Sequence, residues 1–150
     1  MKRLSHFLLL VFGLLPAGLT ARADSSEPIK NFITPTFTPE GFRSMLLRGS
    51  EAQMLTPRLI QLGDMNLTVF SGDAANRIDS ILLSPLARVS LDDDTARGPG
   101  AVRLIQYDKA GAENLELTGE EWTYEHTQKR MSLHKNVHVV FHAELNDLLK

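Results

Sequence analysis

The chain has 150 residues, a formal net charge of −2 and no cysteine. Its length allows one domain, and the lack of cysteine excludes disulfides, thiol catalysis and cysteine-based metal sites. Lysine and arginine form no basic stripe. We therefore expect no nucleic-acid partner, because neutralising phosphates requires clustered positive side chains.

Residues 1–23 have the layout of a secretory signal peptide. Lys2 and Arg3 precede an apolar run at 7–15, and a small-x-small site ends at Ala23. This order predicts a helical leader that is cleaved after Ala23, and a periplasmic location for the mature protein. An uncleaved inner-membrane anchor is the less favoured alternative, because the apolar run is about half of the ~20 residues that span a bilayer.

Residues 24–40 are predicted to be a disordered lead-in to a single β-domain at 41–150. Pro28, Pro35 and Pro39 lie there among serine and threonine. Such a composition is typical of extended, poorly ordered segments near a chain terminus.

The stretch at 115–141 predicts two strands joined by a charged turn. Apolar residues occupy odd positions up to Gly119 and even positions directly after it. A shift of one residue moves every following side chain to the other face of a sheet. Glycine within a strand suits a bulge or a tight corner, so we expect a corner at Gly119.

The same pattern occurs seventy residues earlier, with a second corner expected at Gly49. Self-similarity at a fixed spacing indicates a repeated architecture. We infer two cornered strand pairs that enclose one apolar interior. The matching positions are Met45, Leu47, Gly49, Glu51, Ala52, Met54, Asn66, Leu67 and Val69 against Leu115, Leu117, Gly119, Glu121, Trp122, Tyr124, Asn136, Val137 and Val139.

Between these pairs, residues 81–91 predict a strand with one buried face. Apolar side chains occupy odd positions, including Ile81, Leu83 and Val89. Such alternation is typical of a half-buried strand, and Pro85 predicts an edge or a bulge. Asp92–Asp94 and Gly98-Pro99-Gly100 then predict an acidic, turn-rich loop before a further strand at 101–107. Many short strands and no sustained helical periodicity indicate an all-β fold.

The histidines at 134, 138 and 142 do not predict a metal site. On a strand, residues four apart are separated by ~13 Å, which is too far to share one ion. The run Asp92–Asp94 could bind calcium, but it lacks the alternating ligands of a calcium-binding loop and is better explained as an exposed turn.

No catalytic residue is predicted either, so we expect a protein that is not an enzyme and has no cofactor and no metal. Glu120 and Glu121 are strand neighbours on opposite faces, so they cannot flank one glycosidic bond. A hydrolase or metal enzyme would need His126, His134 or the acidic loop to converge in space.

Trp122 and Tyr124 lie two residues apart and share a face beside the Gly119 corner. They can anchor the core at a bend, or they can form an aromatic mouth for a lipid or sugar ligand. Both interpretations suit large side chains with a polar tip.

Taken together, these residues resemble the OstA-like domain of the periplasmic lipopolysaccharide-transport family, which includes LptA- and LptC-type proteins. The resemblance rests on the repeated glycine corner, on Lys135-Asn136-Val137-His138-Val139 and on the intervening segment at 81–89, and it covers roughly residues 41–145. It implies an open β-jelly-roll, a taco-shaped folded sheet of antiparallel strands. LptC-type proteins usually keep an N-terminal anchor, and this chain is short for an LptA-type protein.

The resemblance also implies a function, namely lipopolysaccharide transport and assembly. Acyl chains would bind in an apolar groove, and strand edges would pair with other transport proteins or with further copies of the chain. The alternative is a structural cell-envelope β-domain with a sealed core and no lipid ligand. The residues expected to face the groove are Ile81, Leu83, Val89, Leu117, Trp122, Tyr124, Leu133, Val137 and Val139.

Overall fold

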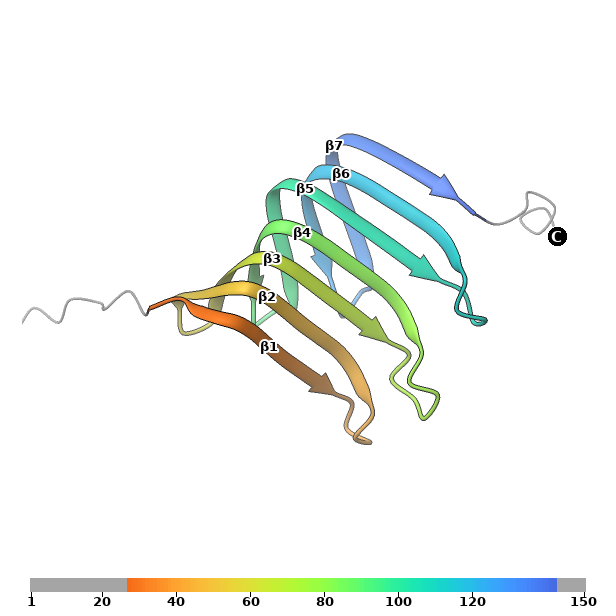
Figure 1. The fold of residues 1–150 in the computed structure, drawn as a ribbon, viewed down its shortest axis with the longest axis horizontal. Coiled ribbons are helices and arrows are strands. Elements are labelled where there is room, and N and C mark those ends of the chain that lie inside the picture. The colour runs from red at the N-terminus through yellow and green to blue at the C-terminus, as the bar shows by residue number, and fades with distance from the viewer. Residues whose placement is uncertain (1–26, 143–150) are drawn as a thin grey trace, which may run out of the picture.

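A computed structural model describes residues 27–142, which form one open antiparallel sheet of seven strands (Figure 1). Each strand pairs with its neighbours in sequence, so the topology is a meander and the all-β, antiparallel prediction is confirmed. The leader and the tail at 143–150 lie outside the described residues. The strands are β1 Ile29–Phe37, β2 Arg43–Thr56, β3 Leu59–Phe70, β4 Ile78–Ser90, β5 Thr95–Tyr107, β6 Glu113–Glu125 and β7 Arg130–Phe141.

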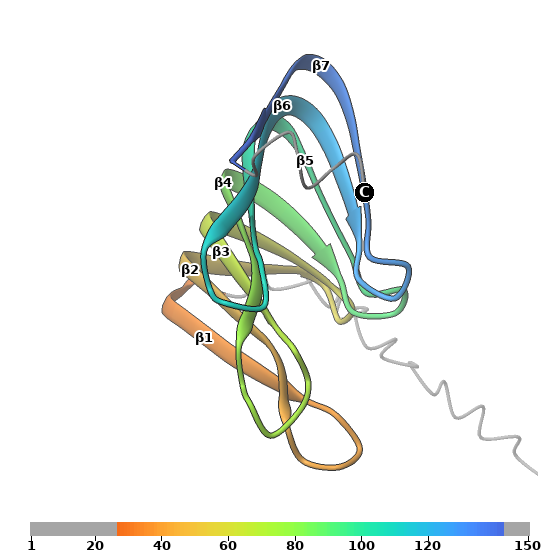
Figure 2. The ribbon, with the colours of Figure 1, turned by 90° about the vertical axis from the view of Figure 1, so that its right-hand side faces the viewer.

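The sheet is folded across its strands, so that β2 to β7 each contribute to two facing arms (Figure 2). We call arm A the part that carries the β1–β2, β3–β4 and β5–β6 turns, and arm B the part that carries the β2–β3, β4–β5 and β6–β7 turns. Arm A comprises residues 32–49, 65–84, 101–119 and 137–141. Arm B comprises residues 51–63, 86–98 and 121–135.

Irregular backbone in the middle of the strands accompanies the bend. Asn31, Asp64, Glu121 and Asn136 have φ values of 53°, 47°, 52° and 50°, although they lie within strands. A residue with left-handed backbone interrupts the regular alternation of side chains and changes the direction of the strand. Strands β3, β6 and β7 therefore have a corner near their centres, whereas Asn31 lies close to the start of β1.

The phase changes predicted at Gly49 and Gly119 are found. Leu47, at an odd position, and Ala52, at an even position, are both buried on the inner side of β2. The alternation of inward side chains therefore shifts by one residue between them. A Cβ on Gly49 would lie 3.0 Å from Leu62, and one on Gly119 would lie 3.0 Å from Leu133. Glycine therefore also allows close packing at the corner.

The loop predicted at 92–100 is only partly a loop. Asp92–Asp94 forms the β4–β5 turn, but Gly98-Pro99-Gly100 lies inside β5. Gly98 pairs with Trp122 and Ala101 pairs with Glu120, so two residues of β5 face one of β6. This is a bulge, and the extra position lies outside the ladder, which suits a proline without an N–H.

The disordered lead-in predicted at 24–40 is also corrected, because β1 lies within it. Phe32 packs against the core cluster, and its burial helps to stabilise this edge strand. Pro35 is tolerated there because an edge strand has one side without a partner.

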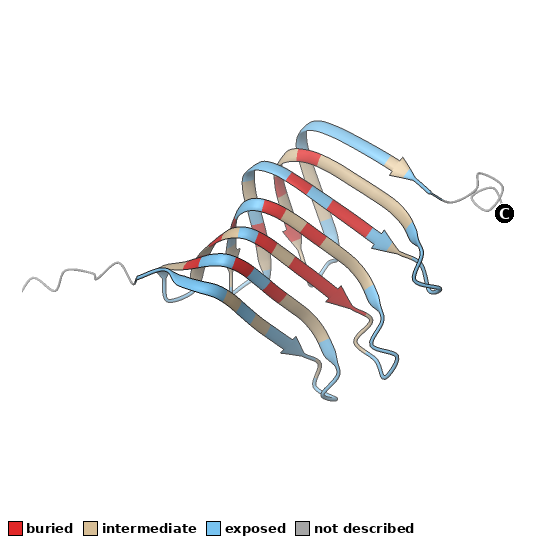
Figure 3. Cartoon of the chain, viewed as in Figure 1, coloured by how far each residue is buried: buried red, intermediate tan, exposed pale blue. Residues whose placement is uncertain are grey.

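The core lies between the two arms (Figure 3). Its buried side chains come mainly from β2 to β6, whereas β1 and β7 at the edges are largely exposed. The core cluster consists of Leu47, Ala52, Ile60, Leu62, Met65, Leu67, Val69, Leu82, Ala87, Ala96, Val102, Leu104, Trp122 and Tyr124.

The sequence predicted that Ile81 and Leu83 face the groove, and this prediction is wrong. Leu82, which pairs with the core residue Leu67, is 1% exposed and belongs to the core. Side chains alternate along a strand, so Ile81 and Leu83 lie on the outer face. Beyond Pro85 the phase changes, and Ala87 and Val89 are the inward residues. The sequence pattern did not indicate this change, because all three residues at 81–83 are apolar and fit inward side chains at either odd or even positions.

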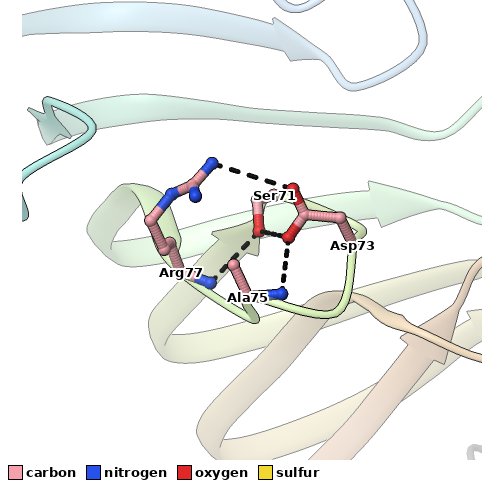
Figure 4. A network of polar contacts seen from close by, with 4 residues as sticks. All are labelled: Ser71, Asp73, Ala75 and Arg77. Atoms are coloured by element: carbon pink, nitrogen blue, oxygen red, sulfur yellow. Dashed lines mark hydrogen bonds and ion pairs between the residues drawn. The ribbon is translucent and has the colours of Figure 1, made fainter.

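A polar network closes the β3–β4 turn (Figure 4). The Asp73 carboxylate accepts hydrogen bonds from Ser71 Oγ at 2.7 Å and from the Ala75 amide at 3.0 Å. Ser71 Oγ accepts one from the Arg77 amide at 3.1 Å. The hydrogen bond from Ser71 is the main cause of a lowered Asp73 pKa. These local contacts order the turn at the rim of arm A.

Candidate functional site: the inner face of the folded sheet

The space between the arms is closely packed near the corner. Leu62 and Ala87 are fully buried, and the Trp122 side chain is 2% exposed. A Cβ on Gly98 would lie 2.7 Å from the indole nitrogen of Trp122. The deepest part of the fold is therefore filled by the protein's own side chains.

Further from the corner, the arms enclose a cavity that we call the His126 hollow. Its volume is about 170 Å³. Arm A contributes Met45, Leu47 and Leu67, and arm B contributes Val89, Ala96 and His126. Apolar side chains thus face each other across the hollow, and polar residues of β1 (Thr34 and Thr36) and of the β4–β5 turn (Asp94) also line it.

A second cavity, the Lys129 hollow, lies between the arms on the other side of Tyr124. Its volume is about 310 Å³, and its lining is more polar, with Ser80, Gln106 and Lys129 among its residues. Tyr124 lines both hollows. This buried aromatic side chain therefore borders both hollows.

The groove residues predicted from the sequence fall into four groups. Trp122 and Tyr124 are buried in the core, and Val89, Leu117 and Leu133 are partly buried against it. Val139 pairs with Leu117, so Val137 and Val139 lie on the inner face of β7, but they are 52% and 41% exposed. Ile81 and Leu83 lie on the outer face.

Val137, Val139 and Phe141 form an apolar ledge on β7. All three are large and exposed, and they follow one another on the inner face of arm A. The inner face is therefore covered in its middle and open at the β7 edge.

Several inner residues were missed by the sequence analysis, namely Met45, Leu47, Leu67, Val69, Leu82 and Ala96. The seventy-residue repeat contained the signal for three of them. Leu47, Leu67 and Val69 correspond to Leu117, Val137 and Val139, which are among the expected groove residues. Applying the repeat in both directions would have placed them on the same face.

His126 has an unusual environment at the edge of its hollow. Its Nδ1 atom is buried and has no hydrogen-bond partner among the described residues. Burial lowers the pKa of His126, which the nearby Asp94 carboxylate partly opposes and Lys129 reinforces. The Tyr124 ring lies 6.3 Å away, and burial raises the pKa of its hydroxyl. The imidazole is thereby favoured in its neutral form.

The outer face carries two depressions near the corner, of about 650 and 450 Å³. Arg103, which lines the larger one, pairs with Glu116 at 2.7 Å. Arg88 and Arg97, which line the smaller one, pair directly across β4 and β5. Charged side chains therefore line parts of both outer depressions.

The described residues form no group of three or more histidines, cysteines and acidic residues that could hold a metal ion. The acidic turn and His126 do approach one another, because the His126 amide donates a hydrogen bond to the Asp94 carbonyl at 3.1 Å. His134 lies elsewhere, beside the outer depression at the corner.

Within residues 27–142, no helix is long and apolar enough to cross a membrane. The sequence matches no known protein-family model and no curated protein.

Proposed function

We propose that this protein is a non-enzymatic periplasmic carrier that binds the acyl chains of lipopolysaccharide or a similar lipid between its two arms. The observation that carries the proposal is the pair of apolar inner faces in a sheet that remains open. Strands β1 and β7 are the two ends of the sheet order and do not pair with each other. The arms are therefore joined along the corner, and their inner faces can separate without breaking strand pairing.

Burial of hydrocarbon supplies the driving force in this proposal. Each Å² of apolar surface removed from water contributes about 25 cal/mol. The hollows of about 170 and 310 Å³ lie at or below the small end of ligand pockets. A lipid chain would thus replace arm-to-arm contacts, and the arms would move apart as it enters.

The ledge of Val137, Val139 and Phe141 supports a role for the β7 end. An exposed apolar surface of this kind is typical of an interaction site. It lies beside the free backbone of an edge strand, which can accept a strand from another protein. We propose that other transport components, or another copy of this chain, extend the inner face there.

The sequence resemblance supports the same function. The OstA-like pattern was based on corners at Gly49 and Gly119, and both positions carry the phase change. A signal peptide, as predicted at 1–23, would deliver the domain to the compartment where such transport occurs. N-terminal sequencing of protein recovered from a periplasmic extract checks this location.

A second candidate function is a structural cell-envelope domain that binds no lipid. The complete burial of Leu62 and Ala87 favours this alternative, because a filled interior needs no ligand. The two proposals differ in whether hydrocarbon can reach the inner face.

Photo-crosslinking from neighbouring positions of β7 tests the carrier. A photoreactive side chain at Val139 lies on the inner face, and one at His138 points to the outer face of the same strand. The carrier predicts a lipid adduct from position 139 and little from position 138. Equal labelling at both positions, or no adduct from folded protein at 139, would favour the structural alternative.

A further inference from the structure

We propose that the His126 hollow binds the hydroxyl-bearing end of a single alkyl chain, and that Tyr124 limits the length of chain the hollow accepts. This inference rests on the proposed function, because it specifies which part of an amphiphilic ligand enters between the arms. It adds a preference for a hydroxyl group and names Tyr124 as the residue that limits chain length.

The shape of the hollow favours a chain end. Its volume is about 170 Å³, and its sides are lined by Met45, Leu47, Leu67 and Val89. A pocket that fully surrounds a drug-sized molecule is usually several hundred Å³. The hollow is therefore suited to one narrow aliphatic segment.

His126 provides the polar recognition. Its buried Nδ1 has no hydrogen-bond partner among residues 27–142, and a buried polar atom without a partner is costly. The neutral imidazole, favoured by burial, has one ring nitrogen that accepts a hydrogen bond. A ligand O–H at this position would satisfy it.

The charge of the hollow selects against an acid. Asp94 lines the same hollow and is close enough to influence the His126 pKa. A ligand carboxylate placed there would be repelled by Asp94, whose effect on the His126 pKa is larger than that of the cationic Lys129, whereas a neutral hydroxyl would not be repelled. The expected head group is thus an alcohol or hydroxyacyl oxygen.

Tyr124 is assigned the length limit because it is the residue that the linings of the two hollows share. It lines both, and it belongs to the core cluster that joins the arms. Removing its ring would connect the His126 hollow to the larger Lys129 hollow. Replacing Tyr124 with phenylalanine would keep this ring and remove only the hydroxyl.

Calorimetric titration of the full mature chain with 1-alkanols from hexanol to dodecanol tests the proposal. For the wild type, affinity should increase with chain length and then level off, and octanol should bind more tightly than octanoate. Tyr124→Phe should keep the same limit, whereas Tyr124→Ala and Tyr124→Leu should move it to longer chains. His126→Phe should weaken octanol binding about fivefold, the range expected for one lost hydrogen bond.

The outcomes separate this inference from the proposed function. If the wild type gives the Val139 adduct but binds no alkanol, or binds octanoate as well as octanol, the inference is overturned and the carrier remains. An unchanged length limit in folded Tyr124→Leu overturns the role of Tyr124. Tight alkanol binding without a lipid adduct at position 139 would support the His126 hollow as a binding site and contradict the proposed carrier function.

Discussion

The indole of Trp122 occupies the space that a side chain on Gly98 would need. A Cβ there would lie 2.7 Å from Trp122 Nε1 and 2.6 Å from the Leu86 carbonyl oxygen. The bulge in β5 and the largest buried side chain of the core therefore depend on each other. This relationship predicts that the corner is sensitive to a single methyl group.

Gly98→Ala should destabilise the fold by about 1–3 kcal/mol, the usual cost of forcing extra volume into a packed site. Urea unfolding followed by Trp122 fluorescence measures the change. Gly100→Ala is the matched control, because a Cβ there meets nothing within 4 Å. Equal stability of the two variants would contradict the packing of Trp122 against β5.

Leu82→Ala and Leu83→Ala should differ sharply, although the residues are neighbours. Leu82 is 1% exposed in the core, so its truncation should cost about 2–5 kcal/mol. Leu83 lies on the outer face and is half-buried, so its truncation should cost about 1 kcal/mol or less. Thermal or denaturant unfolding of both variants compares them, and the reverse order would restore the face assigned from the sequence.

Asn136→Val should destabilise β7, even though valine favours strands. The φ of Asn136 is 50°, a conformation that costs a β-branched residue about 1–2 kcal/mol or more. Asn136→Gly should be close to neutral. His138→Val provides a control two residues along the strand, where φ is not positive and valine should be tolerated. A neutral Asn136→Val would show that the corner in β7 does not need this backbone.

Stability should decrease as the pH falls below about 6.5, and His126 should contribute to the loss. Burial lowers its pKa from the ordinary value of 6.5, so the unfolded chain binds the proton first. The destabilisation therefore begins near that value and grows until the pH falls below the pKa in the folded state. Asp94 opposes the shift and Lys129 adds to it.

The unfolding temperature of wild type and His126→Gln at pH 7.5 and 5.5 measures this effect. The wild type should lose more stability than the variant over this interval. His134→Gln is the control, because His134 is exposed. An identical loss in wild type and His126→Gln would exclude a buried, neutral His126.

The repeat and the alternation of residues predicted much of the fold. The phase change at Gly49 and Gly119 required only the positions of apolar residues, because strand geometry has a strict period of two. The corners in β3 and β5 were less visible. Asp64 adopts a left-handed φ with no glycine at that position, and Gly98-Pro99-Gly100 resembled a loop although it is a bulge.

The inner face was predicted less completely than the strands. Ile81, Leu82 and Leu83 are all apolar, so their pattern does not show which face is buried. Pairing of Leu82 with Leu67 decides the question, and this contact depends on the register of two strands. The His126 hollow arises from packing of arm A against arm B, so no local pattern near His126 could have indicated it.

The placement of corners within individual strands has a consequence for how such a protein can change in size. Asp64, Glu121 and Asn136 each bend their own strand, and each hairpin brings two inward surfaces with it. Inserting or deleting a whole hairpin would therefore alter the length of the molecule while preserving its cross-section. Modular growth of this kind needs no redesign of the remaining strands.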